Sequence, residues 1–323
     1  MTKLPFIRLP KWLYALASAS LISVAATGCG LADDARTTAP ESQPMSLIGT
    51  PLRDPAWSAQ TRANLETDLR IARAAMEIAP DREDSYIWLG RRLAYLERFP
   101  EAIEVFTQGL SKFPDSYKLL RFRGRKLARS RQFEAALADY ARGIELMENI
   151  PDSYEPDGIL NARNQFLGSY RGNMHYYWAQ TSWAIGDYEA VLRGMERSSK
   201  EPLAQNPDHL LATKYWRYLA LRKLGRDQEA AELIREVPAN LELLENFAYY
   251  DGVRFMQGSL SREELLAKAD SVSLFAVAMD HHFRGEQQQA EALWESIIRD
   301  APQGFWPAET ELVASRRKAA DRT

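Results

Sequence analysis

Basic residues are concentrated between Tyr117 and Arg131. This stretch of 15 residues holds seven basic side chains and no acid, although the whole chain has 41 Lys and Arg against 44 Asp and Glu. Four of these side chains are spaced three or four residues apart and would share one face of a helix: Lys118, Arg121, Arg125 and Arg129. Like charges at this spacing weaken an isolated helix by roughly 0.2–0.5 kcal/mol per pair. The stability of the helix therefore does not explain the pattern, which indicates that these charges interact with a group outside the helix.

Two explanations fit this basic face. Guanidinium groups suit carboxylates and phosphates, so an acidic peptide, the C-terminus of a polypeptide or a lipid phosphate could bind there. The basic side chains could instead pair with acids of neighbouring helices or of the loop Asp152 to Asp157. The sequence leaves both open.

The same loop carries four oxygen-bearing side chains that could be considered as Ca²⁺ ligands: Glu155, Asp157, Asn161 and Asn164. The spacing of a Ca²⁺-binding EF-hand loop is absent, and Glu155-Pro-Asp-Gly158 is typical of a tight turn with Pro in its second position. We expect a turn, on a loop that could also fold over a neighbouring groove. An unrecognised hydrolase that acts on an envelope polymer through Glu155 or Asp157 is a further alternative.

Other catalytic and metal-binding patterns are missing. The sequence has four histidines and one cysteine, which excludes a cysteine-based zinc site, and His281 and His282 point to different sides of a helix. It contains no His-Glu-x-x-His, Gly-x-Ser-x-Gly, phosphate-loop or dinucleotide-loop pattern. We therefore expect no catalytic residues, no metal and no cofactor, and we do not expect an enzyme.

The N-terminus has the pattern of a targeting signal. Lys3, Arg8 and Lys11 precede 15 apolar and small residues, Trp12 to Ala26. This stretch is shorter than the roughly 20 residues of a spanning helix, so residues 1–28 are predicted to be a signal peptide. Its removal would take away three positive charges and no acid, and would change the net charge from −3 to −6. We therefore do not expect nucleic acid as a partner.

The run Ala26-Thr27-Gly28-Cys29 resembles the lipobox of bacterial lipoproteins, with Ala26 where Leu is usual. The resemblance implies lipidation of Cys29 and, because Gly30 follows, a position on the periplasmic face of the outer membrane. The alternative is a secreted periplasmic protein, since Ala26-Thr27-Gly28 also fits an ordinary signal-peptidase site. Residues 29–58 lack helical periodicity and are predicted to form a flexible tether, so that the membrane is contacted only through the lipid anchor.

A 34-residue period dominates the rest of the sequence. Leu89-Gly90, Leu93, Ala102, Phe106, Gly109 and Pro114 recur as Arg123-Gly124, Leu127, Ala136, Tyr140, Gly143 and Glu148. The pattern resembles the tetratricopeptide repeat (TPR), with Tyr86 and Leu120 in place of its usual Trp. This pattern and the stretch Asp152 to Gly158 together resemble a group of bacterial TPR proteins. The resemblance implies no activity. The resemblance implies an all-α fold, a right-handed solenoid of antiparallel helix pairs; a generic helical bundle is the alternative.

The predicted solenoid covers residues 59–310, followed by a polar tail at 311–323. Five helix pairs are expected at 83–116, 117–150, 172–205, 211–244 and 271–304. Pro151, Pro156 and Gly158 interrupt the period at 150–171, and residues 245–270 predict an imperfect pair whose second helix starts at Ser261, with Glu264 completing a capping box.

In the TPR family the first helix of each pair lines the ligand groove. Carried onto this sequence, the groove-facing residues would be Arg91, Tyr95, Lys118, Arg121, Arg125, Arg129, Asn173, Tyr176, Gln180, Trp183 and Tyr215. An aromatic stripe at helical spacing also fits core packing. We expect an envelope lipoprotein that binds another protein or an acidic peptide as an adaptor or assembly factor. A carrier or sensor of an anionic small molecule or lipid is the alternative, and the sequence does not indicate the partner or the oligomeric state.

Overall fold

The computed structural model describes residues 45–321, apart from residues 54, 160 and 302. Cys29 and the predicted signal peptide lie outside the described residues. The elements, in sequence order, are α1 (Ala59–Ile78), α2 (Glu83–Tyr95), α3 (Phe99–Lys112), α4 (Tyr117–Arg129), α5 (Phe133–Leu146), α6 (Tyr170–Ala184), α7 (Tyr188–Lys200), the short 3₁₀ turn η1 (Pro202–Ala204), α8 (Pro207–Lys223), α9 (Asp227–Arg235), α10 (Phe247–Met256), α11 (Arg262–Leu266), α12 (Ser271–Phe283), α13 (Gln287–Asp300) and α14 (Trp306–Ala320).

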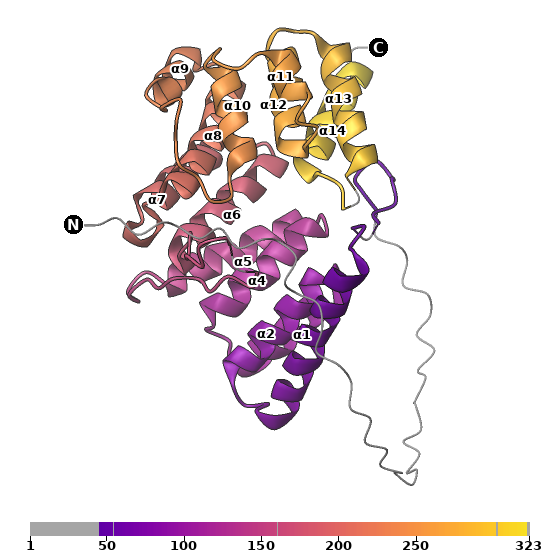
Figure 1. The fold of residues 1–323 in the computed structure, drawn as a ribbon, viewed down its shortest axis with the longest axis vertical. Helices are drawn as coiled ribbons and strands as arrows, with labels where there is room; N and C mark the ends of the chain where they lie inside the picture. Colours follow the sequence, from indigo (N-terminus) through magenta and orange to yellow (C-terminus); the bar gives the residue numbers. More distant parts are fainter. Residues whose placement is uncertain (1–44, 54, 160, 302, 322–323) are drawn as a thin grey trace, which may run out of the picture. The chain divides into compact units, whose positions relative to one another are not determined.

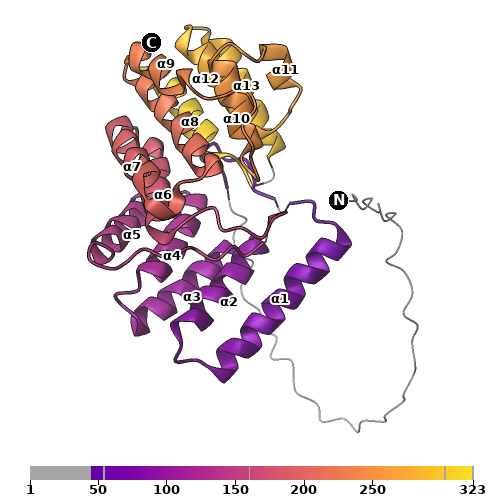
Figure 2. The same cartoon turned by 60° about the vertical axis from the view of Figure 1, so that its left-hand side comes forward.

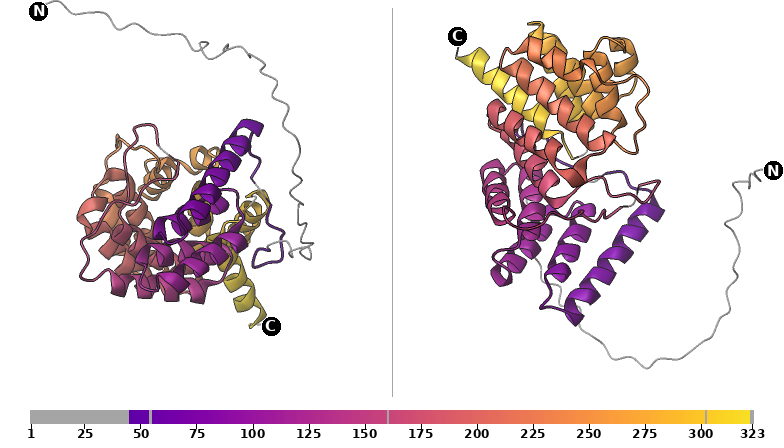
Figure 3. Two further views of the ribbon diagram at one scale, coloured as in Figure 1. Left: turned by 90° about the horizontal axis from the view of Figure 1, so that it is seen from below. Right: turned by 90° about the vertical axis from the view of Figure 1, so that its left-hand side faces the viewer.

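The helices pack as antiparallel pairs in sequence order (Figure 1). Each helix of the regular pairs contacts mainly the helix before it and the helix after it, and the first helices of successive pairs also touch each other. We call the surface formed by these first helices, α2, α4, α6, α8 and α12, the first-helix face. Figure 3 shows α1 to α5 side by side from two further directions. The prediction of an all-α fold built from TPR-type helix pairs is confirmed for the described residues.

Small residues allow the two helices of a pair to approach each other. A Cβ atom added at Gly90 would lie 2.3 Å from Phe106, and one added at Gly124 would lie 2.9 Å from Tyr140. The large ring on the second helix thus occupies the space that a side chain on the first would need. These are the small and large positions that repeat every 34 residues, so the period reflects helix packing.

The irregular pair between α9 and α12 also has the predicted form. Helix α11 begins after Ser261, whose side chain accepts from the Glu264 amide while the Glu264 carboxylate accepts from the Ser261 amide. This is the expected capping box, although α11 is only five residues long. No described helix is long and apolar enough to cross a membrane.

The two ends of the described region differ from the prediction. Residues 45–53, expected to belong to the flexible tether, pack on the C-terminal helices: Leu52 is buried and the Gln303 side chain donates to the Arg53 carbonyl at 2.6 Å. Residues 311–320, expected to be a polar tail, continue α14, in which Leu312 and Glu311 are buried. Both predictions were wrong for these residues because their partners lie far away in the sequence.

Candidate functional site

Arg121 lies at the centre of the basic face predicted from the sequence. Its side chain is only 2% exposed, and its Nη2 donates to the carboxylate of Glu155 at 2.7 Å. The other carboxylate oxygen accepts from the Asn173 side chain on α6 at 3.1 Å. One carboxylate is therefore held between two neighbouring first helices, α4 and α6.

Aromatic rings connect Arg121 to two further arginines. Arg91 and Arg121 both lie against Phe122, with 4.6 and 5.1 Å from guanidinium carbon to ring centre. Arg121 and Arg125 both lie against Tyr177, at 4.3 and 4.2 Å. Each guanidinium therefore gains a favourable contact with a ring face. We call Arg91, Arg121 and Arg125 the arginine row.

Positive charge exceeds negative charge around this row. Burial, and then repulsion from Arg121 and Arg129, lowers the pKa of Arg125 to about 10. The pKa of Lys126 is lowered well below its usual range by burial and by Arg125 and Arg129. Nη1 of Arg91 and both Nε and Nη1 of Arg121 are enclosed without a hydrogen-bond partner among the described residues. The arginine row thus has more hydrogen-bond donors than the described residues satisfy.

The segment that supplies Glu155 covers the arginine row. We call residues 151–169, between α5 and α6, the insert. Arg91 donates to the Pro156 carbonyl at 2.6 Å and Arg92 to the Gly158 carbonyl at 3.0 Å, so the insert reaches from α6 across α4 to α2 (Figure 2). The structure thus has the alternative that the sequence left open, a loop that folds over the first helices.

The tight turn expected at Glu155-Pro-Asp-Gly158 is not found among the described residues: residues 155–157 lie outside any turn, because Arg121 holds the Glu155 side chain and Arg91 holds the Pro156 carbonyl. The turn lies further on, where the Asn161 side-chain oxygen accepts from the amides of Arg163 and Gln165, and an antiparallel bridge joins Tyr154 to Ser169. Among the described residues, no group of three or more His, Cys, Asp or Glu side chains is arranged to hold a metal ion. The polar residues of the insert thus shape the loop and its contact with the arginine row.

The remaining basic residues pair with acids of neighbouring elements. Arg129 lies 3.7 Å from Glu97 and Lys118 lies 3.9 Å from Glu83. Internal pairing, one of the two explanations for the basic face, is therefore present. The arginine row nevertheless has fewer acidic than basic side chains around it.

Several predicted groove residues are core residues instead. Trp183 packs against Trp216 at 5.6 Å between ring centres, and Tyr215 donates to the Val272 carbonyl at 3.0 Å. Tyr176 is also buried and accepts from the Trp216 indole. These three aromatic residues are closed to a ligand because α8, α10 and α12 pack over them, which corrects the prediction. Gln180 is half-buried, and Tyr95 lies under Gly158 of the insert.

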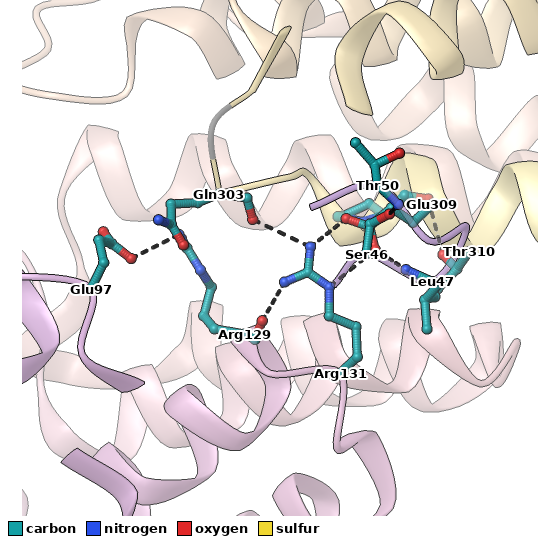
Figure 4. Close-up of polar contacts among 10 residues, drawn as sticks. Ser46, Leu47, Thr50, Glu97, Arg129, Arg131, Gln303, Glu309 and Thr310 are labelled. Carbon is teal, nitrogen blue, oxygen red and sulfur yellow. Dashed lines mark hydrogen bonds and ion pairs between the residues drawn. The ribbon is translucent and has the colours of Figure 1, made fainter. Parts of the chain in front are cut away.

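A second long-range contact joins α14 to the turn between α4 and α5, and its acid, Glu309, is not predicted from the sequence. Glu309 of α14 is fully buried and pairs with Arg131, which lies in the turn between α4 and α5 (Figure 4). One Glu309 oxygen accepts from Arg131 Nε at 3.0 Å and from the Leu47 amide at 2.9 Å. We call Arg131, Glu309 and Leu47 the clasp. Nearby, Glu311 accepts from Lys223 of α8 at 2.7 Å.

One signal in the sequence could have indicated the clasp. The corresponding turns after α6, α8 and α12 have Gly186, Gly225 and Gly285 at positive φ, whereas the turn after α4 has Arg131 at φ 61°. A charged residue where other turns have glycine indicates that its side chain has a use elsewhere.

The helix pairs have counterparts in solved structures of low sequence identity. No protein-family model matches the sequence, and the search of curated proteins finds no match. The solved structure of YrrB, a TPR protein with an unusual peptide-binding site, aligns with 74% of this chain and 97% of its own, at 10% identity and a TM-score of 0.41. Naa15/Naa10 bound to HypK-THB aligns with 78% of this chain over 36% of its own length, at 10% identity and a TM-score of 0.36. The fold assignment rests on the helix pairing described above.

Proposed function

We propose that this protein is a non-catalytic scaffold that binds an extended segment of another protein on its first-helix face. The observation that carries the proposal is that this face already binds an extended segment of its own polypeptide. Arg121 contacts a carboxylate of the insert, while Arg91 and Arg92 contact its backbone carbonyls. Contacts to backbone carbonyls recognise an extended polypeptide independently of its side chains, and the carboxylate contact adds selectivity.

A non-catalytic role is supported by the contacts of Glu155. Both oxygens of its carboxylate are engaged, by Arg121 and Asn173, so the carboxylate has a structural role on the first-helix face.

We further propose that the scaffold is a lipoprotein of the bacterial envelope, anchored through Cys29. The support is the signal-peptide pattern and the sole cysteine at its predicted cleavage point. Mass spectrometry of the protein expressed with its own signal is expected to find acyl groups on Cys29. An unmodified thiol, or a mature protein that lacks this residue, would replace the anchored protein with a secreted one.

Photo-cross-linking in cells tests the binding role. A photoreactive residue at Gln180, on the first-helix face, is expected to capture one recurring envelope protein. The same residue at Ile78, which is highly exposed at the end of α1, serves as the control. Capture at Gln180 should weaken with Arg125→Gln. An equal set of products from both positions, or no product from Gln180, would remove the binding role.

A second candidate function is the binding of a small anion, which the unpartnered N–H groups of Arg91 and Arg121 favour. Inorganic phosphate and acetate are the probes. If either stabilises the protein against heat, and Arg125→Glu removes the effect while Arg142→Glu on the exposed face of α5 retains it, the arginine row binds small anions. A melting temperature unchanged by both ions would exclude this candidate.

A further inference from the structure

Polar contacts hold the insert on the first-helix face. Among the described residues from 151 to 168, Glu155 alone is buried, at 8% exposure. Three large apolar side chains of the insert are exposed: Tyr154 is 47% exposed, Ile159 62% and Phe166 46%. Docking therefore depends on the carboxylate contact with Arg121 and Asn173 and on the contacts of Arg91 and Arg92 with the Pro156 and Gly158 carbonyls.

Removal of this carboxylate alone would be costly. Arg121 would remain buried without its counter-ion, and such an unpaired charge strongly destabilises a folded protein. The cost is avoided if another carboxylate arrives at the same place. The N–H groups of Arg91 and Arg121 that have no hydrogen-bond partner among the described residues are enclosed. An incoming carboxylate therefore takes the place of Glu155 on Arg121 and does not bind beside it.

We propose that the insert is a resident ligand, which an acidic extended segment of a partner protein displaces from the arginine row. The partner's carboxylate takes the place of Glu155, and its backbone carbonyls replace those of Pro156 and Gly158 on Arg91 and Arg92. This inference rests on the proposed binding function and specifies its ligand. The exposed Tyr154, Ile159 and Phe166 allow the insert to detach without losing a buried apolar cluster.

The contact with Tyr95 adds a second requirement. A Cβ atom at Gly158 would lie 1.8 Å from the Tyr95 hydroxyl oxygen, so a side chain at this place requires the ring to move. The partner segment is therefore expected to have an acid followed three residues later by glycine, as Glu155 is followed by Gly158. The first-helix face thus selects a carboxylate and a small residue at a fixed spacing.

Fluorescence anisotropy with a labelled peptide tests the exchange in the full-length protein. The peptide copies residues 151–159. Glu155→Gln in the protein removes the resident carboxylate, and we expect it to bind the peptide at least about tenfold more tightly than the wild type does. Glu148→Gln, which removes an exposed acid just before the insert, is the matched control and should match the wild type. Two altered peptides, with Gln at the Glu155 position or Ala at the Gly158 position, should each bind at least about tenfold more weakly.

A measurement on the wild type covers the case in which Glu155→Gln does not fold. The Glu155 amide donates to the Gly168 carbonyl and the Tyr170 amide to the Ser153 carbonyl, so both amides report on the pairing of the two ends of the insert that positions Glu155. Saturating peptide is expected to speed hydrogen exchange at both amides, and the Gln-containing peptide is not.

The outcomes separate this inference from the proposed function. Equal peptide affinity of the wild type and Glu155→Gln, equal binding of the Gln-containing peptide, or unchanged exchange at both amides would each overturn the exchange. Cross-linking from Gln180 would still support a scaffold that binds its partner in another way. Exchange without any cross-linked partner would retain the acidic-peptide site and remove the cellular role.

Discussion

Arginine makes contacts in this site that lysine could not. The Arg121 guanidinium faces the rings of Phe122 and Tyr177, while one of its edges donates to Glu155. A planar fork can stack and donate simultaneously, whereas an ammonium group is a compact and strongly hydrated charge. Arg91 and Arg121 therefore tolerate burial, which explains why like charges that weaken a helix can accumulate on α4.

Two buried histidines make the stability of the protein dependent on pH. Burial lowers the pKa of both His175 and His209 from 6.5 to about 4, and His209 shares a hydrogen bond with Ser198 at 2.8 Å. As the pH falls below 6.5, the unfolded state binds protons that the folded state does not, so acidification favours unfolding. From pH 6.5 to pH 5 we expect the free energy of unfolding to decrease by about 1.5 kcal/mol per histidine.

Urea unfolding at several pH values measures this effect. The decrease should be strongly reduced in the double variant His175→Gln/His209→Gln, and the wild type should change little between pH 8 and pH 7, where both states are neutral at these positions. If the double variant loses stability between pH 6.5 and 5 as steeply as the wild type does, these histidines are not the source.

At the scale of the helices, glycine has different roles at two positions of the repeat. A Cβ atom at Gly90 meets the Phe106 ring at 2.3 Å, whereas one at Gly143 meets the end of the flexible Met174 side chain at 2.5 Å. We expect Gly90→Ala to decrease the free energy of unfolding by about 1–3 kcal/mol, because the ring is fully buried. Gly143→Ala should be neutral or stabilising, since Met174 can move and alanine favours the helix by roughly 1 kcal/mol.

Chemical denaturation of the two variants measures the difference, and each is the other's control. Equal destabilisation would mean that Met174 is held as rigidly as Phe106. It would also mean that the glycine positions of the repeat are equivalent in their packing.

Two turns between paired helices have a charged residue at positive φ. Glu97 and Arg131 have φ 61° and lie 34 residues apart, at equivalent places in two repeats. A non-glycine residue in this region is strained by about 1 kcal/mol or more. Both side chains form ion pairs with another element, Glu97 with Arg129 and Arg131 with Glu309. These contacts give the charged residues a function that glycine could not provide.

At the scale of the whole described region, the clasp adds a contact that a linear array does not have. In a simple solenoid each repeat contacts only its neighbours. Here Arg131 and Glu309 are 178 residues apart, and the ring of Phe133 contacts Trp306 of α14 at 5.6 Å. The C-terminal helix therefore stabilises the second repeat directly.

Glu309→Gln tests this long-range coupling. The variant leaves the buried Arg131 without its counter-ion, so we expect the free energy of unfolding to decrease by roughly 3 kcal/mol. Hydrogen exchange should become faster in α4 and α5 as well as in α14. The control is Glu295→Gln, which breaks the exposed pair with Arg316 on α14 and should change the free energy of unfolding by less than about 1 kcal/mol. Faster exchange confined to α13 and α14 would show that the repeats are coupled only to their neighbours.

Features that depend on local spacing could be predicted from the sequence. The 34-residue period predicted the helix pairs because Gly90 and Phe106, or Gly124 and Tyr140, meet within one repeat. The capping box of Ser261 and Glu264 is equally local. The basic face on α4 was visible for the same reason, since three- and four-residue spacing sets one side of a helix.

The contacts made by the basic face of α4 could be seen only in the folded protein. Spacing along one helix cannot reveal that Glu155 pairs with Arg121, that Glu309 pairs with Arg131, or that Trp183 and Tyr215 are closed off by helices further along the sequence. For the same reason, residues 45–53 were predicted to be part of a tether, although they pack on the C-terminal helices. The energies of these contacts depend on burial and on partners far away in the sequence, which periodicity does not encode.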